Sequence, residues 1–194
     1  MALFTALYDR VMHWARHRHA VWYLGGLSFA ESSFFPIPPD VMLAPMSLAQ
    51  PRRAYRYALI TTLTSVLGGL LGYAIGHFAL DWLAPLIGEG GRWYGHYQHA
   101  LAWFAEWGFW AVFLAGFSPI PYKVFTISAG ALAMALLPFL IASAIGRGAR
   151  FFLVAGLLAW GGPRMEAALR RYVERLGWLL VATALLAYLV MRAA

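Results

Sequence analysis

The fold is decided by residues 31–40, Glu-Ser-Ser-Phe-Phe-Pro-Ile-Pro-Pro-Asp, and by residues 117–123, Phe-Ser-Pro-Ile-Pro-Tyr-Lys. A shift of 83 residues places 24–40 on 107–123 with five identities in 17 positions, three of them in the Pro-Ile-Pro triplet. The same shift places an unbroken apolar run at 57–80 on residues 140–163. We interpret this as an internal repeat, in which each half contains one proline-broken segment followed by one full helix.

The composition is typical of a polytopic membrane protein. Of the 194 residues, 62% are hydrophobic and 12% are charged, and the mean hydropathy is +0.64. An ordinary soluble domain, with about 25% charged residues, is therefore excluded. The net charge of +7 comes from clustered arginines, a pattern typical of cytoplasmic loops, so we expect no nucleic-acid partner. The absence of cysteine excludes disulfides, thiolate nucleophiles and cysteine-ligated metals.

Hydropathy and charge divide the chain into the segments of one all-α membrane domain. Residues 1–19 place apolar side chains, arginines and histidines at helical spacing, which predicts an amphipathic helix at the lipid surface or, alternatively, a frayed basic tail. Residues 81–106 combine charges with many aromatic side chains and predict an interfacial loop. Apolar runs predict transmembrane helices at 57–80, 137–160 and 177–191.

The two broken segments, 20–49 and 107–136, are predicted to be re-entrant hairpins. If residues 20–49 crossed the bilayer, the arginine clusters at 10–18 and 52–56 would lie on opposite sides, against the positive-inside tendency. Hairpins give the two halves inverted topology and place the N-terminus in the cytoplasm. Proline has no N–H to leave unsatisfied where a chain reverses in lipid, and the predicted tip residues are Pro36, Pro38, Pro39, Pro119 and Pro121. Proline-kinked spanning helices in a generic bundle are the alternative.

Five ionisable residues lie in otherwise apolar membrane segments. They are Glu31, Asp40, Lys123, Arg147 and Arg150. Each costs about 2.5–3.5 kcal/mol at a bilayer centre, so we expect them to form ion pairs or to line a wet cavity. Two acids and three bases leave one positive charge, which suits an anion such as a lipid phosphate. A neutral acid that couples transport to protons, or purely structural ion pairs, would also account for the pattern.

Three glycines, Gly68, Gly72 and Gly76, share one face of the predicted helix 57–80, where another backbone can approach closely. That backbone can belong to the same chain or to a second copy, so an oligomer is compatible with the sequence. Metal-helix, nucleophile-elbow and phosphate-loop motifs are absent from the sequence. We therefore expect no enzymatic activity, no catalytic residues, no metal and no cofactor.

Three motifs surround these features: Glu31–Asp40, Phe117–Gly130 and Gly146–Phe152. Together they resemble the DedA family of membrane proteins, also called the SNARE-associated or VTT-domain superfamily, and within it the YqaA-type branch. The resemblance covers roughly residues 20–165. It implies facing re-entrant hairpins, a bacterial inner-membrane location, and the transport or scrambling of lipids such as undecaprenyl phosphate or phosphatidylethanolamine.

The resemblance also implies roles for individual residues. Glu31 and Asp40 match the membrane-embedded acidic pair of the family. The basic pair of the second hairpin is matched in part, because Lys123 stands where an arginine is expected. Arg147 and Arg150 are available instead from the following helix.

These observations predict a membrane lipid transporter of the flippase or scramblase type. A phosphate headgroup would enter between the hairpins, where Arg147, Arg150 and Lys123 coordinate it and Glu31 and Asp40 act as counter-charges or proton carriers. The expected partners are a membrane phospholipid or a polyprenyl phosphate and, where an acid titrates, protons. A proton-coupled transporter of a small solute and a non-transporting membrane scaffold are the alternatives.

Overall fold

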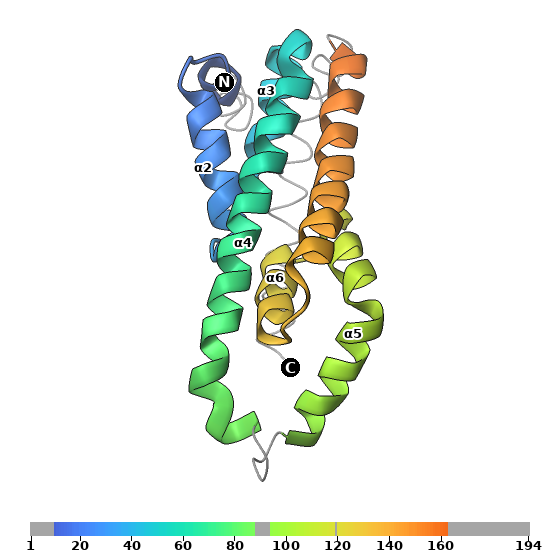
Figure 1. Cartoon of the computed structure of the whole chain (residues 1–194). Helices are drawn as coiled ribbons and strands as arrows, with labels where there is room; N and C mark the ends of the chain where they lie inside the picture. The colour runs from blue at the N-terminus through green and yellow to red at the C-terminus, as the bar shows by residue number, and fades with distance from the viewer. Residues whose placement is uncertain (1–9, 88–93, 119, 163–194) are drawn as a thin grey trace, which may run out of the picture.

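The computed structural model describes residues 10–87, 94–118 and 120–162, and these ranges contain helices and no strands (Figure 1). Three helical stretches are long and apolar enough to cross a membrane: Pro51–Ala79, Tyr94–Phe117 and Leu136–Gly162. The prediction of a helical membrane protein is thereby confirmed, as are the long apolar helices expected at 57–80 and 137–160. Residues 10–15 are helical, whereas the rest of the expected helix at 1–9 and the expected span at 177–191 lie outside the described residues.

The first half of the chain folds as a broken helix pair followed by a long helix. Helix α2 (Ala20–Ser33) ends shortly before Pro36, and α3 (Asp40–Ala49) begins directly after Pro39. A short 3-10 turn, η1 (Pro51–Arg53), leads into α4 (Ala54–Ile87). Helices α2 and α3 both pack against α4, in the upper half of the molecule as drawn in Figure 1.

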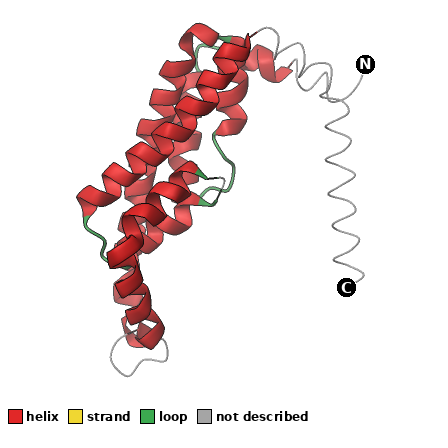
Figure 2. Cartoon of the chain, turned by 90° about the vertical axis from the view of Figure 1, so that its right-hand side faces the viewer, coloured by secondary structure: helices red, strands yellow, loops and turns green. Residues whose placement is uncertain are grey.

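The second half repeats this order of elements. Helix α5 (Tyr94–Phe117) is followed by a break, by α6 (Tyr122–Ala131) and by the long helix Leu136–Gly162. Pro121 precedes α6 in an extended conformation, consistent with its predicted place at a tip, whereas Pro119 lies outside the described residues. Helix α6 also packs against α4. The described helices together form an elongated bundle (Figure 2).

The prediction of an interfacial loop over residues 81–106 was wrong. Helix α4 continues to Ile87 and α5 already begins at Tyr94, so that 88–93, outside the described residues, separates the two helices. Aromatic and charged composition indicates at what depth a segment lies, not which backbone conformation it adopts. The chain has no proline between residues 86 and 118, and its alanines and leucines favour the helix. Helix α5, the first helix of the second broken pair, therefore begins 13 residues before the predicted start at residue 107.

Two apolar clusters enclose a polar layer halfway along the bundle. One cluster includes Tyr57 and Phe151, and the other includes Tyr122 and Phe139. On α4, the buried polar side chains Thr61, Thr62 and Ser65 follow the residues of the first cluster. On the helix Leu136–Gly162, Ser143 and Arg147 lie between Phe139 of one cluster and Phe151 of the other.

The glycine face of α4 packs within the chain. A Cβ atom on Gly68 would lie 2.1 Å from the carbonyl oxygen of Phe29 in α2, and one on Gly76 would lie 1.9 Å from the carbonyl oxygen of Ile127 in α6. A Cβ on Gly72 would lie 2.3 Å from the Thr126 hydroxyl. Of the two possibilities left open by the sequence, the structure shows backbone contact inside one chain.

Replacing Gly76 with alanine is expected to destabilise the protein by about 1–3 kcal/mol, because the new methyl group meets rigid backbone. Gly26→Ala is the matched control, since no atom lies within 4 Å of a Cβ at that helical position. The control is expected to be neutral or slightly stabilising. Thermal unfolding in detergent measures both, and equal melting temperatures for the two variants would contradict the close contact.

Candidate functional site

Arg147 is the centre of the polar layer and is 2% exposed. Its guanidinium forms an ion pair with Glu31 from α2 and donates hydrogen bonds to the hydroxyls of Ser65 from α4 and Ser32 from α2. The Ser32 and Ser65 hydroxyls also lie 2.7 Å apart. Three helices are thus joined through one side chain, which satisfies a cation that would otherwise be costly to bury.

Two aromatic rings cover the remaining surface of this guanidinium. Its central carbon lies 4.7 Å from the ring centroid of Tyr122 and 4.7 Å from that of Phe151. Cation–π attraction is strongest where water is excluded, as it is here. Arg147 is therefore occupied by partners within the chain and offers little of its surface to a ligand.

Asp40 and Arg150 form a second ion pair, which is less enclosed. Arg150 Nη2 lies 2.7 Å from Asp40 Oδ2, and its Nη1 donates to the carbonyl oxygen of Ser118 in the second break. Asp40 is the first residue of α3, where the helix dipole favours a negative charge. The pair connects the first break, the second break and the helix Leu136–Gly162.

Lys123 is the fifth charged residue, and it has no carboxylate partner among the described residues. Its Nζ donates a hydrogen bond of 3.4 Å to the carbonyl oxygen of Phe35 in the first break. Ion pairs in the described ranges join Glu31 to Arg147 and Asp40 to Arg150. One positive charge therefore remains uncompensated when all five groups are ionised.

A cavity of about 250 Å³ lies between the two breaks and reaches all five charged residues. Proline and large apolar residues form the rest of its wall. The lining residues are Glu31, Phe35, Pro36, Pro38, Pro39, Asp40, Ile120, Pro121, Lys123, Arg147 and Arg150. The residues selected from the sequence, from segments up to 119 positions apart, thus converge on one small polar cavity.

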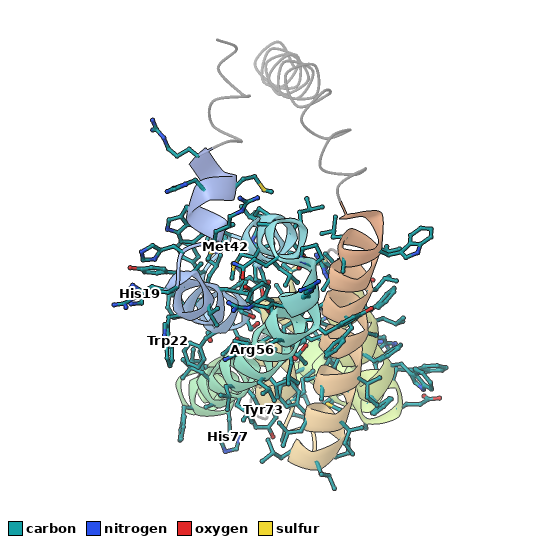
Figure 3. All side chains as sticks on the ribbon, turned by 90° about the horizontal axis from the view of Figure 1, so that it is seen from above. His19, Trp22, Met42, Arg56, Tyr73 and His77 are labelled. Atoms are coloured by element: carbon teal, nitrogen blue, oxygen red, sulfur yellow. The ribbon has the colours of Figure 1, made fainter. Side chains whose placement is uncertain are left out.

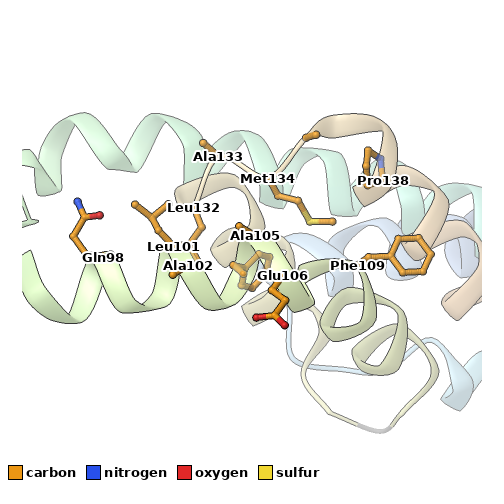
Figure 4. Close-up of a pocket in the computed structure, with 12 residues that line it drawn as sticks. Gln98, Leu101, Ala102, Ala105, Glu106, Phe109, Leu132, Ala133, Met134 and Pro138 are labelled. Atoms are coloured by element: carbon orange, nitrogen blue, oxygen red, sulfur yellow. The ribbon is translucent and has the colours of Figure 1, made fainter.

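A larger cavity, of about 580 Å³, lies between α5 and the connection that precedes the helix Leu136–Gly162 (Figure 4). Its wall is mostly apolar, and Gln98 and Glu106 are its polar side chains. It contains none of the five charged residues. The volume of a cavity therefore does not identify the site. The convergence of five charged residues on the smaller cavity does.

Sequence reasoning missed the groups that hold the charges in place. Ser32, Ser65, Tyr122 and Phe151 contact Arg147 or its partners, and none of them was selected. A signal existed for Ser65, because it follows Thr61, Thr62 and Thr64 within an apolar run. The described residues contain no group of three or more histidines or acidic residues close enough to bind a metal ion.

Comparison with known proteins gives one family and two close relatives. The VTT domain matches residues 37–160. An uncharacterized protein of Haemophilus influenzae is 48% identical over 192 residues, which cover 99% of this chain and 100% of the relative. An uncharacterized protein of Histophilus somni is 49% identical over 192 residues, with the same coverage. No solved structure matches the chain.

Proposed function

Because the chain belongs to the VTT domain family, we propose that it is a membrane lipid transporter, of the flippase or scramblase type and without enzymatic activity. In this proposal, the phosphate of a phospholipid or polyprenyl phosphate crosses the membrane through the cavity between the two breaks. The acyl or polyprenyl chains stay in the bilayer. The cavity volume of about 250 Å³ supports the entry of the headgroup alone, since pockets that hold whole ligands measure roughly 300–1,000 Å³.

The bounds of the helices support an inverted repeat of two re-entrant hairpins. Shifted by 83 residues, α3 (Asp40–Ala49) would cover 123–132, and α6 is Tyr122–Ala131. The start of α4, Ala54, would fall on 137, and the corresponding long helix begins at Leu136. Helices α3 and α6 each have 10 residues, or about 15 Å, which is half of a bilayer core.

The distribution of arginine supports an orientation in the membrane. With hairpins that return to the side from which they enter, the arginine clusters at 10–18 and 52–56 lie on one side. The positive-inside rule makes this side cytoplasmic, with the N-terminus, in a bacterial inner membrane. Both breaks then meet near the midplane, where transporters built from repeats bind their substrates.

The observation that carries the proposal is the uncompensated Lys123 in the charged cavity. A site with two internal ion pairs and one additional cation attracts a single negative charge, and a phosphodiester has one. Arg150 is near enough to share the phosphate, whereas Arg147 has a structural and electrostatic role. The ammonium of Lys123 attracts the anion, and the nearby carboxylate of Asp40 repels it, so that the anion is bound weakly enough to leave.

Asp40 is the proposed proton carrier if transport is coupled to protons. Its Oδ2 accepts from Arg150, while its Oδ1 is buried without a hydrogen-bond partner among the described residues. A buried carboxylate oxygen without a hydrogen-bond donor is costly, and a proton on that oxygen or a bound water that donates to it reduces the cost. Glu31 is the weaker candidate, because its carboxylate already forms the enclosed ion pair with Arg147.

Headgroup translocation in liposomes tests the proposed function. Purified protein is reconstituted with a headgroup-labelled fluorescent phospholipid, and dithionite bleaches the label that reaches the outer leaflet. We expect protein-dependent bleaching of the protected inner half of the label. Transport of a water-soluble phosphate compound without headgroup movement would favour the small-solute alternative, and movement of neither would favour the scaffold.

A further inference from the structure

A groove of about 470 Å³ lies between α2 and α4 and shares no lining residue with the charged cavity. Its wall is apolar apart from one end. The lining residues are Val21, Trp22, Gly25, Gly26, Phe29, Arg56, Ile60 and Thr64. Gly26 creates part of the hollow, because a side chain at this position would meet nothing within 4 Å.

The groove runs parallel to α2 and α4. Both helices begin next to arginine clusters, at residues 10–18 and 52–56, and we call this the arginine-rich end. Helices α2 and α4 are parallel, as shown by hydrogen bonds from Ser28 to Thr61 and between Ser32 and Ser65. Its residues on α4 follow one another at intervals of four, from Arg56 through Ile60 to Thr64. This spacing gives the groove a length of about 12 Å. The Thr64 hydroxyl donates to the Ile60 carbonyl, so the deep end offers no free hydroxyl donor.

The charge is confined to the shallow end. Arg56 is exposed, and within residues 10–87, 94–118 and 120–162 it forms no ion pair. Trp22, which is 79% exposed, lies on the neighbouring helix (Figure 3), and tryptophan favours the level of lipid headgroups. A cation above a narrow apolar groove matches one kind of membrane component, an acyl chain attached to an anionic headgroup.

We propose that this groove binds one acyl chain of an anionic phospholipid from the arginine-rich side, with the lipid phosphate at Arg56. The chain lies between α2 and α4 beside Gly25 and Gly26, and Trp22 contacts its glycerol region. This inference does not depend on the proposed transport, because the groove and the charged cavity have separate walls. It assigns the site to a bound lipid, independent of any transported substrate.

Quenching of Trp22 fluorescence by brominated lipids tests this site. The full chain is reconstituted in phosphatidylcholine vesicles that contain either phosphatidylglycerol or phosphatidylcholine brominated on the acyl chains. The signal of Trp22 is the difference between the wild-type protein and Trp22→Phe. Phosphatidylglycerol is expected to quench it with about fivefold higher apparent affinity than phosphatidylcholine, the gain that one cation near an anionic lipid provides.

Two variants and one matched control distinguish lipid binding in the groove from a general attraction of anionic lipids to surface arginines. Arg56→Gln is expected to abolish the fivefold preference, and Gly26→Leu to abolish it by filling the groove. Arg52→Gln removes a charge that is also exposed but does not line the groove, and this variant is expected to retain the preference. Equal quenching by both lipids in the wild-type protein, or an equal loss in Arg52→Gln and Arg56→Gln, would overturn the proposal.

The same variants distinguish this proposal from the transport function. Arg56→Gln is expected to translocate headgroups at the wild-type rate, because Arg56 does not line the charged cavity. Loss of phosphatidylglycerol preference with transport intact therefore supports the groove site by itself. Retention of the preference in a protein that fails to translocate any lipid would overturn the transport proposal and leave the groove site standing.

Discussion

Replacing Glu31 with alanine is expected to destabilise the protein by about 3–5 kcal/mol, the cost of leaving a buried cation without its partner. Arg147 is 2% exposed, and Glu31 is its carboxylate partner. The serine hydroxyls that also accept from Arg147 are neutral and do not compensate its charge. Thermal or denaturant unfolding in detergent measures the change.

Two further variants define the origin of this loss. Glu106→Ala is the matched control, since Glu106 is exposed and forms no ion pair among the described residues, and a change within about 0.5 kcal/mol is expected. The double variant Glu31→Ala with Arg147→Met removes both charges and is expected to recover most of the stability. A Glu31→Ala protein as stable as the wild type would show that the ion pair is not a structural element of the bundle.

Lys123→Gln is expected to lower the rate of headgroup translocation at least tenfold while leaving the stability nearly unchanged. A hydrogen bond between a charged donor and a phosphate contributes roughly 1.5–3 kcal/mol, which corresponds to a factor of about ten or more. Lys123 contributes little to the fold, because its contact with Phe35 is a long hydrogen bond of 3.4 Å. The dithionite assay and thermal unfolding measure the two effects separately.

Lys123→Arg retains the charge and is expected to preserve most of the activity, which identifies the cation as the required feature. Arg53→Gln removes an exposed cation outside the cavity and is expected to transport at the wild-type rate. A Lys123→Gln protein with undiminished translocation would mean that the cation of this cavity does not bind the moving headgroup.

Much of the architecture could be predicted from the sequence, because its determinants are local. Pro36, Pro38, Pro39 and Pro121 lie where the helices are interrupted, as expected, and long apolar runs form the helices that follow. The segment 81–106 was misjudged because interfacial composition is compatible with both loop and helix, and a helix already formed on either side extends through residues that tolerate it. In this segment the helix propensity of the residues determined the backbone conformation, and the interfacial composition did not.

The five charged residues that line the cavity could be selected from the sequence, but their pairing could not be predicted. The cost of charge in lipid identified all five residues without any structural information. Arg147 and Arg150 lie three residues apart on one helix face, yet they pair with different acids, and the side chain of Arg147 is more enclosed than that of Arg150. That difference depends on how α2, α3 and α6 are rotated and packed, which the sequence pattern does not specify.

The most direct test of the central claim is whether a lipid headgroup reaches the cavity. The chain has no cysteine, so a single cysteine can be placed at Ile120, which lines the cavity, or at Val124, which does not. These two side chains have similar exposure, 49% and 54%. Each variant is treated in liposomes with a phospholipid that carries a thiol-reactive methanethiosulfonate group on its headgroup, and lipid adducts are quantified by mass spectrometry.

We expect a lipid adduct on Ile120→Cys that exceeds the one on Val124→Cys, and that decreases when Lys123→Gln is introduced as well. A small water-soluble thiol reagent reports separately whether the cavity is wet. Reaction of Ile120→Cys with the soluble reagent but not with the lipid reagent would contradict the account, because the cavity would then admit water and exclude headgroups.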